Sequence, residues 1–330
     1  MYKVDKKVLV TGCSGFIGFH LSNSLMEEGN QVIGIDSLNS AYDVKLKQKR
    51  LEKLNNNNNF TFFNNNLSRE DSLNEIRNYD ISTIYHMAAR AGVRQSFLDP
   101  QSYIKDNTYA TATISNFCKE MDIPEIILAS TSSIYGDSGE KLMIEDKDEK
   151  LKPPSVYAST KLSGESLSKI ILEDTNIKLI IARFFTVYGP YGRPDMSILR
   201  FIHWIVNEEK VKVFGNGEQQ RSFTYIQDVV DALRSMSGLE KSFTFNVGSD
   251  ITVSLNEVIK LIENFSGKNA NIENLERAYK DPDVVRPNLG NIKKTIGWEP
   301  TTKIQDGIEK TVAWYKENES FLKELVYVNE

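Results

Sequence analysis

The sequence predicts an α/β protein with a doubly wound parallel sheet and a smaller C-terminal α/β lobe. Three observations support this fold class. A glycine-rich turn follows the first apolar strand, apolar strands alternate with helical segments up to about residue 185, and this alternation loosens after residue 188. Alternating strands and helices are typical of sheets whose parallel strands are joined by crossover helices.

The first elements form a complete βαβ unit. Residues 7–10 are a short apolar strand, residues 12–18 a glycine-rich turn, and residues 20–28 a helical pattern. A second apolar strand, residues 31–36, ends in Asp36. A turn of this kind at the start of a crossover helix is typical of dinucleotide-binding proteins.

The turn has the pattern G-x-x-G-x-x-G, with Gly12, Gly15 and Gly18. Glycines here permit a tight turn and close approach of the backbone to a pyrophosphate, whose charge faces the helix N-terminus. Asp36 can accept hydrogen bonds from both ribose hydroxyls and would repel a 2′-phosphate, which favours NAD over NADP. The structural alternative is a flavodoxin-like βα turn.

Further strands and helices extend the predicted sheet. The strands are expected at residues 60–63, 83–87, 125–129 and 178–184, and the helices at residues 68–78, 100–121 and 154–175. Ligands of such sheets bind at the carboxyl ends of the strands. Ala88, Ala89, Thr131, Phe185 and Thr186 follow directly on these strands, so we expect them at the binding edge.

The C-terminal part has shorter elements. Helices are predicted at residues 197–208, 227–238, 255–265 and 304–318, and strands at residues 211–214 and 243–247. We expect residues 1–185 to form the dinucleotide-binding domain, to which residues 222–248 return. Residues 186–330 would mainly form a substrate lobe that closes over the cofactor.

Tyr157 and Lys161 are a candidate catalytic pair. Side chains four residues apart lie on one face of a helix, and the segment around them has a helical pattern. A neighbouring ammonium favours the phenolate and lowers the Tyr pKa, so that Tyr157 can act as a base. The alternative is a half-buried Tyr beside a solvated Lys, because the Y-x-x-x-K pattern is common by chance.

Composition excludes several function classes. The 330-residue chain has 40 Lys and Arg against 45 Asp and Glu, a net charge of −5, so no nucleic-acid partner is expected. Cys13 and Cys118 provide neither a disulfide framework nor metal-ligand spacing, and no metal site is expected. We find no signal peptide or membrane-spanning run, which predicts a cytoplasmic protein with no membrane partner.

Motifs along nearly the whole chain resemble the extended short-chain dehydrogenase/reductase superfamily, which has a Rossmann-type sheet and uses NAD. The motifs are Thr11-Gly12-x-x-Gly15-Phe16-Ile17-Gly18, Asp36, His86-x-Ala88-Ala89, Asp99-Pro100 with Tyr103 and Asn107, Thr131-Ser132-Ser133-x-Tyr135-Gly136, Tyr157-x-x-x-Lys161 and Arg221-x-Phe223-Thr224-Tyr225-Ile226-x-Asp228.

Within the superfamily, the sequence is most similar to nucleotide-sugar 4-epimerases, in particular those of UDP-glucuronate. Residues 36–51, 88–96 and 183–196 carry this similarity, although Arg90 stands where Gln is usual. Ser132 and Ser133 replace the Asp-Glu pair of 4,6-dehydratases. A UDP-glucuronate decarboxylase, a UDP-glucose or UDP-N-acetylglucosamine 4-epimerase, and a non-catalytic NAD-sensing protein are the alternatives.

The resemblance implies a mechanism through a 4-keto sugar. Tyr157 takes the proton of the sugar 4-hydroxyl, Thr131 hydrogen-bonds the same oxygen, and Lys161 holds the nicotinamide ribose. Ser132, Ser133, Thr186 and Arg193 would hold a substrate carboxylate.

The resemblance also implies the binding residues. NAD would contact Gly12, Gly15, Phe16, Ile17, Gly18, Asp36, Asn66, Leu67, Ala88, Ala89, Asn107, Tyr157 and Lys161. The UDP-sugar would contact Arg94, Thr131, Ser132, Ser133, Tyr157, Thr186, Arg193, Phe214, Arg221, Lys280 and Arg286. Three of these have structural alternatives: a solvated Arg193, a core Phe214 and an Arg94 paired with an acid. Asn66 stands where relatives carry Asp.

A homodimer is expected on the same grounds. The predicted helices at residues 100–121 and 154–175 carry apolar stripes, and two copies of the pair would form a four-helix bundle. The alternative is that both helices only pack on the sheet.

Overall fold

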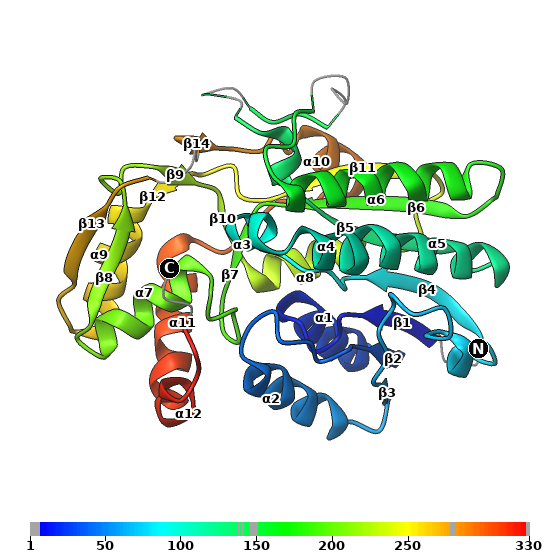
Figure 1. Cartoon of the computed structure of the whole chain (residues 1–330), viewed down its shortest axis with the longest axis horizontal. Helices are drawn as coiled ribbons and strands as arrows, with labels where there is room; N and C mark the ends of the chain where they lie inside the picture. Colours follow the sequence, from blue (N-terminus) through cyan, green and yellow to red (C-terminus); the bar gives the residue numbers. More distant parts are fainter. Residues whose placement is uncertain (1–6, 138, 140–141, 146–150, 278–281, 328–330) are drawn as a thin grey trace.

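The computed structural model describes residues 7–137, 139, 142–145, 151–277 and 282–327 (Figure 1). Its main sheet has seven parallel strands in the order β11-β6-β5-β4-β1-β2-β3. These strands are β1 (Lys7–Thr11), β2 (Gln31–Ile35), β3 (Phe60–Phe63), β4 (Ile81–His86), β5 (Glu125–Thr131), β6 (Lys178–Phe184) and β11 (Phe243–Val247). The doubly wound fold is confirmed.

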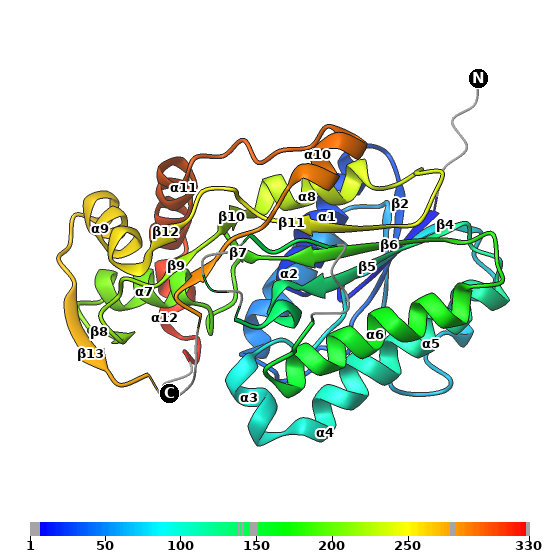
Figure 2. The ribbon, with the colours of Figure 1, turned by 90° about the horizontal axis from the view of Figure 1, so that it is seen from above.

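Helices cover both faces of this sheet, as Figure 2 shows. One face carries α3 (Val93–Leu98), α4 (Pro100–Tyr103), the π-helix η2 (Ile104–Tyr109), α5 (Ala110–Glu120) and α6 (Val156–Leu172). The other carries α1 (Phe16–Glu27), α8 (Ile226–Ser235) and α10 (Gly290–Ile296), with α2 (Val44–Asn55) beside α1.

Side chains of each strand alternate between the two faces, so the sheet separates two hydrophobic cores. Val8 and Val10 belong to the core that contains Phe19 of α1. Leu9, between them, belongs to the core that contains Ile114 of α5. The apolar runs in the sequence therefore reflect strands that are buried on both faces.

The C-terminal lobe is built on small sheets. Pairings are β7–β10, β8–β13 and β12–β9–β14. Its elements are β7 (Thr186–Tyr188), α7 (Ser197–Val206), β8 (Lys210–Phe214), β9 (Gln220–Arg221), β10 (Phe223–Tyr225), β12 (Val253–Ser254), α9 (Leu255–Ser266), β13 (Asn271–Leu275), β14 (Val284–Val285), α11 (Ile304–Glu317) and α12 (Glu319–Lys323). The core on the α1 face continues into this lobe.

The predicted helix at residues 68–78 is wrong. The segment forms turns and the short 3-10 helix η1 (Asn74–Ile76). Asn side chains compete with helix formation there: Asn66 accepts from the Ser68 amide at 2.9 Å, and Asn65 donates to the Ser72 carbonyl at 3.0 Å. The predicted helix at residues 100–121 is present, but η2 interrupts its α-helical hydrogen bonding.

Among the described residues, we find no helix whose length and hydropathy would let it span a bilayer.

Asp228 connects the main sheet's helix layer to the C-terminal segment. Its carboxylate accepts hydrogen bonds from the Thr301 amide and hydroxyl, both at 3.1 Å, and from the Thr302 amide at 3.2 Å. Its backbone carbonyl accepts from Trp298 Nε1 at 3.0 Å. Asp228 is buried. These hydrogen bonds explain why an acid stands at this position, and no role in the chemistry is needed to explain it.

We expect Asp228→Ala to destabilise the folded chain by about 2–4 kcal/mol, because three hydrogen bonds to a buried carboxylate are lost. Urea unfolding followed by circular dichroism measures this. Asp231→Ala, on the same helix but engaged in a partly exposed ion pair, is the matched control and should change stability by less than about 0.5 kcal/mol. Equal effects of the two substitutions would contradict this assignment.

Candidate active site

A pocket of about 360 Å³ lies at the carboxyl edge of the main sheet. Most of the predicted site residues line it: Gly12, Gly15, Phe16, Ile17, Gly18, Asp36, Asn66, Leu67, Ala88, Ala89, Thr131, Ser132, Ser133, Tyr157, Lys161, Thr186 and Arg193. The structure therefore brings together residues that are far apart in the sequence, as the strand ends predict.

The glycine turn can be made only from glycines. Gly12 has φ +68°, and a Cβ on it would lie 2.7 Å from the Ala88 nitrogen of the neighbouring strand end. A Cβ on Gly18 would lie 2.2 Å from the Gly12 carbonyl oxygen. Gly15, the N-cap of α1, provides no side-chain cap, so the first amides of this helix are available to a phosphate.

Asp36 lies at the end of β2 on the pocket wall and is 8% exposed. Its carboxylate accepts from the Ser14 amide at 3.1 Å and the Leu38 amide at 2.8 Å, which fixes its orientation. A fixed, partly accessible carboxylate fits the ribose diol of a dinucleotide. Together with the open helix N-terminus, this donor and acceptor set fits NAD.

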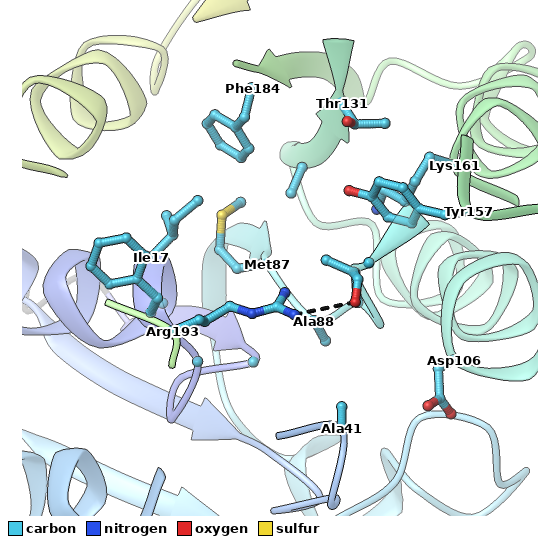
Figure 3. Close-up of a pocket in the computed structure, with 18 of the residues that line it drawn as sticks. Ile17, Ala41, Met87, Ala88, Asp106, Thr131, Tyr157, Lys161, Phe184 and Arg193 are labelled. Carbon is cyan, nitrogen blue, oxygen red and sulfur yellow. Dashed lines mark hydrogen bonds between the residues drawn. The ribbon is translucent and has the colours of Figure 1, made fainter. Parts of the chain in front are cut away.

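Tyr157 and Lys161 point into the pocket from α6, and Thr131 lies near them at the end of β5 (Figure 3). Burial raises the pKa of Tyr157, and the Thr131 hydroxyl and the charge of Arg193 act in the opposite direction. Burial lowers the pKa of Lys161 to about 8, against the charge of Glu165. We expected Lys161 to lower the Tyr157 pKa, but the pKa is raised, because burial outweighs the opposing effects of Thr131 and Arg193.

A buried ion pair lies one helical turn behind Lys161. Arg183 of β6 donates to both carboxylate oxygens of Glu165, at 3.1 and 2.7 Å, and the two side chains are 0% and 1% exposed. The Ser130 hydroxyl donates to the same carboxylate. The pair fixes α6 to strands β5 and β6, and so fixes Tyr157 relative to Thr131.

The hydroxyl groups after β5 form a compact donor set. Residues Ser132–Tyr135 make a 3-10 helix, η3, whose N-cap is Thr131. Thr131 Oγ1 accepts from the Ser133 amide at 3.2 Å and lies 3.2 Å from the Ser133 hydroxyl. Ser132, Ser133 and Thr186 all line the pocket. Within the described lining, the two acids are Asp36 and Asp106.

Arg193 comes from the loop after β7 and crosses the pocket wall (Figure 3). Its Nε donates to Asp195 at 3.0 Å, and its Nη2 donates to the Ala91 carbonyl at 3.2 Å, the bond that is dashed in Figure 3. Its side chain is 14% exposed. The solvated alternative for Arg193 is therefore wrong, and its charge acts to lower the pKa of Tyr157.

The two Asn residues predicted to bind the cofactor differ: Asn66 lines this pocket and Asn107 is not part of its lining. Asn107, in η2, instead holds the wall: it accepts from the Arg90 amide at 2.7 Å and donates to Thr160 Oγ1 at 3.0 Å. Asn66 lines the pocket, but its side-chain oxygen also accepts from the Ser68 amide. The contacts of Asn107 thus support the pocket wall, and its contact with NAD stays a prediction.

The other described residues that we predicted to contact the UDP-sugar lie on the C-terminal lobe and on α3. The Arg94 guanidinium stacks 3.9 Å from the Phe214 ring centroid, joining α3 to β8. Arg221 Nη1 donates to the Gln220 carbonyl at 2.8 Å, and Arg286 Nε donates to the Asp250 carbonyl at 3.0 Å. Phe214 is half-buried rather than part of the core.

The predicted contact of Lys280 lies outside the described residues.

Sequence reasoning gave no role to three residues that shape the pocket, Asn39, Tyr42 and Lys47. Lys47 is 5% exposed, donates to Asn39 Oδ1 at 2.7 Å and lies 4.9 Å from the Tyr42 ring centroid. Burial lowers the pKa of Lys47, whereas the charge of Asp36 raises it. The sequence offered one signal for this part of the pocket. Lys47 and Arg50 are basic, lie three positions apart and share the buried face of one helix.

The fold and the site define a dinucleotide-dependent enzyme whose pocket is lined by Tyr157 and Lys161. Residues 8–248 match the NAD dependent epimerase/dehydratase family, and the chain belongs to that family. This confirms the predicted superfamily and NAD as the cofactor.

Relatives with assigned activities match nearly the whole chain. UDP-glucuronate 4-epimerase of Thermodesulfobacterium geofontis is 39% identical over 320 residues, which cover 96% of this chain and 98% of the relative. The structure of UDP-glucuronic acid 4-epimerase from Bacillus cereus, in complex with UDP-glucuronic acid and NAD, matches with a TM-score of 0.87 at 32% identity. That match covers 94% of this chain and 99% of the other.

UDP-glucose 4-epimerase of Thermotoga maritima also has this fold, with a TM-score of 0.87 at 25% identity over 94% of this chain and 99% of the other.

We expect Lys161→Met to stabilise the fold at pH 7 by up to about 3.5 kcal/mol, because burial lowers the pKa of Lys161 from 10.5 to about 8 and a pKa difference of one corresponds to about 1.4 kcal/mol. The lowered pKa means that the folded state binds this proton more weakly than the unfolded state. The penalty is therefore full below pH 8 and disappears as the pH rises toward 10.5.

Urea unfolding at pH 7 and pH 10 measures this difference, with Lys169→Met, an exposed site on the same helix, as control. A Lys161→Met variant that is less stable than the parent at pH 7 would overturn the prediction.

Proposed function

We propose that this chain is a UDP-glucuronate 4-epimerase that interconverts UDP-glucuronate and UDP-galacturonate. The observation that carries the proposal is one pocket that combines Tyr157 and Lys161 with the hydroxyl and guanidinium donors of Ser132, Ser133 and Arg193. Hydroxyls and a guanidinium both donate hydrogen bonds to a carboxylate. The activities named for the relatives from T. geofontis and B. cereus support the same substrate.

The reaction begins at the sugar 4-hydroxyl. NAD, when bound, accepts a hydride from C4 and returns it. Tyr157 takes the hydroxyl proton, and Thr131 hydrogen-bonds the same oxygen, so the proton has a defined path into the protein. The Thr131 hydroxyl and the charge of Arg193 favour the resulting phenolate, and Lys161 would hold the nicotinamide ribose. After the 4-keto sugar turns within the pocket, Tyr157 returns the proton and the opposite configuration results.

The carboxylate must stay attached during this reaction, because a 4-keto uronic acid is a β-keto acid that loses carbon dioxide readily. Hydrogen bonds from Ser132, Ser133 and Thr186, with the charge of Arg193, would keep the carboxylate ionised. They would also hold the breaking C–C bond out of line with the ketone π system. Elimination chemistry is disfavoured, because the two positions after Thr131 carry hydroxyls instead of an acid pair.

The deciding experiment is incubation of the purified protein with UDP-glucuronate without added NAD, followed by proton NMR of the sugar. We expect UDP-galacturonate, with the cofactor retained on the protein. Tyr157→Phe should lower the rate by about 10²–10⁴-fold, because it removes the acid–base oxygen alone.

A pentose product with carbon dioxide would instead identify a decarboxylase. No turnover, even with added NAD, would reject UDP-glucuronate, and neutral UDP-hexoses would be the next substrates to test.

We further propose a homodimer through a four-helix bundle of the η2–α5 and α6 helices from two copies. These helices lie side by side on one face of the sheet (Figure 2). Exposed apolar side chains gather along this helical layer: Val93, Phe97, Leu98, Ile104, Tyr109 and Ile170. A monomer would leave Ile104 and Ile170 52% and 67% exposed, which favours a partner here.

We expect the double substitution Ile104→Asp and Ile170→Asp to convert a dimer into a monomer, because buried unpaired carboxylates would oppose association. Light scattering after gel filtration measures the mass. Ile251→Asp, equally exposed at 67% but in the loop before β12, should leave the dimer intact. A dimer that survives the double substitution would place the interface elsewhere.

The division into a dinucleotide-binding part, residues 1–185 with the return of residues 222–248, and a substrate lobe remains our proposal. A cytoplasmic location is likewise proposed, because Cys13 and Cys118 are free buried thiols, which suits a reducing compartment. Cell fractionation tests this location.

A further inference from the structure

The loop that carries Arg193 is held by its backbone. Three successive carbonyl oxygens before Arg193 accept hydrogen bonds from the dinucleotide-binding part. His20 Nε2 of α1 lies 2.9 Å from the Pro190 carbonyl oxygen. Arg50 Nη2 of α2 donates to the Tyr191 carbonyl at 2.6 Å and to the Gly192 carbonyl at 3.3 Å.

His20 donates in this contact. Burial lowers the pKa of His20 to about 4, so the ring is neutral at pH 7 and its Nε2 must carry the proton that faces the carbonyl.

Arg50 is completely buried, with 0% exposure. Its guanidinium donates four hydrogen bonds, all to uncharged oxygens. The acceptors are the carbonyls of Ser14, Tyr191 and Gly192 and the hydroxyl of Tyr42. Burial of a guanidinium without a carboxylate in its hydrogen-bond set is costly. A contribution to stability alone does not explain the residue, because an apolar side chain of similar size would fill the space at lower cost.

The second terminal nitrogen of the Arg50 guanidinium, Nη1, contacts the glycine turn. Its Nη1 donates to the Ser14 carbonyl at 2.9 Å and to the Tyr42 hydroxyl at 2.5 Å. The Ser14 amide, on the other side of that residue, donates to Asp36. One planar guanidinium thus contacts two segments: the glycine turn at the cofactor site and the loop that leads into Arg193. It fixes the distance between them.

We propose that Arg50 is a positioning residue that couples the glycine turn of the cofactor site to the loop that places Arg193 in the sugar pocket. A guanidinium suits this task because its two terminal nitrogens donate in fixed directions within one plane, whereas an ammonium is a single point. Formation of the cofactor site and placement of the substrate-facing Arg193 then depend on each other.

The backbone of the loop needs such restraint. Tyr191 has φ +58°, a left-handed conformation that is unfavourable for a non-glycine residue. Its ring packs against Trp314 and Phe19 at centroid distances of 4.8 and 5.0 Å, and Arg50 holds its carbonyl. Without Arg50, this peptide can relax, and Arg193 would leave its position beside Ala91.

The first test is hydrogen–deuterium exchange on the NAD-loaded protein. In Arg50→Met we expect the amides of residues 192–196 to exchange about tenfold faster or more than in the parent, since their local opening becomes easier. The amides of α9 should be unchanged. Lys53→Met is the matched control, because Lys53 lies on the same helix and 5.0 Å from the Tyr191 ring centroid but makes no contact with its carbonyl.

The second test rests on the proposed function and measures the UDP-glucuronate reaction of the same NAD-loaded variants. Arg50→Met should raise KM about tenfold or more and lower kcat. It should also increase the share of the pentose product that forms by decarboxylation, because a misplaced Arg193 no longer holds the substrate carboxylate. Arg50→Lys should be intermediate. His20→Phe, which keeps the ring packing, should give a smaller change in the same direction.

The outcomes separate the two proposals. Unchanged exchange at residues 192–196 in folded Arg50→Met, or unchanged KM, kcat and product ratio, overturns the role of Arg50. Faster exchange in a protein that does not turn over UDP-glucuronate supports the role of Arg50 and rejects the substrate. If Arg50→Met does not fold, Arg50→Lys and His20→Phe decide by the same exchange measurement.

Discussion

The buried ion pair of Glu165 and Arg183 is the interaction on which the geometry of the site depends. It joins α6, which carries Tyr157 and Lys161, to the strands that carry Thr131. Removal of one member of such a pair typically costs about 3–5 kcal/mol, because an uncompensated charge is left inside. Its worth lies in specificity: a hydrophobic contact would allow α6 to slide along the sheet, whereas two parallel hydrogen bonds to one carboxylate set a single register.

Sequence reasoning predicted the parts that depend on local patterns and strand ends. Gly12, Asp36 and Thr131 follow from where strands end, Tyr157 follows from its spacing to Lys161 on a helix, and the pocket contains all four. It failed at residues 68–78, where Asn side chains replace backbone hydrogen bonds, a competition that hydrophobic periodicity does not reveal. It also missed the tertiary role of Arg50, because the carbonyl oxygens that a guanidinium contacts carry no signature in the sequence.

Cationic side chains gather around Tyr42 at the pocket, although Asp36 lines the same pocket and Asp195 is the ion-pair partner of Arg193. The protein has a net charge of −5, yet Lys47, Arg50 and Arg193 lie 4.9, 5.5 and 5.3 Å from the Tyr42 ring centroid. Cations concentrated in a low-dielectric cleft create a local positive potential that attracts anions. Both a dinucleotide and a sugar nucleotide with a uronic acid carry several negative charges, so this cluster suits both ligands.

The return of β11 to the main sheet has a consequence for how the chain unfolds. The chain leaves the sheet after β6, builds part of the C-terminal lobe and then supplies the edge strand that pairs with β6. The core on the α1 face runs without interruption from the sheet into that lobe. Neither part can therefore complete its interior alone, and a single cooperative transition is the natural unfolding behaviour. A gene that encoded only the first half would produce a sheet with an open, aggregation-prone edge.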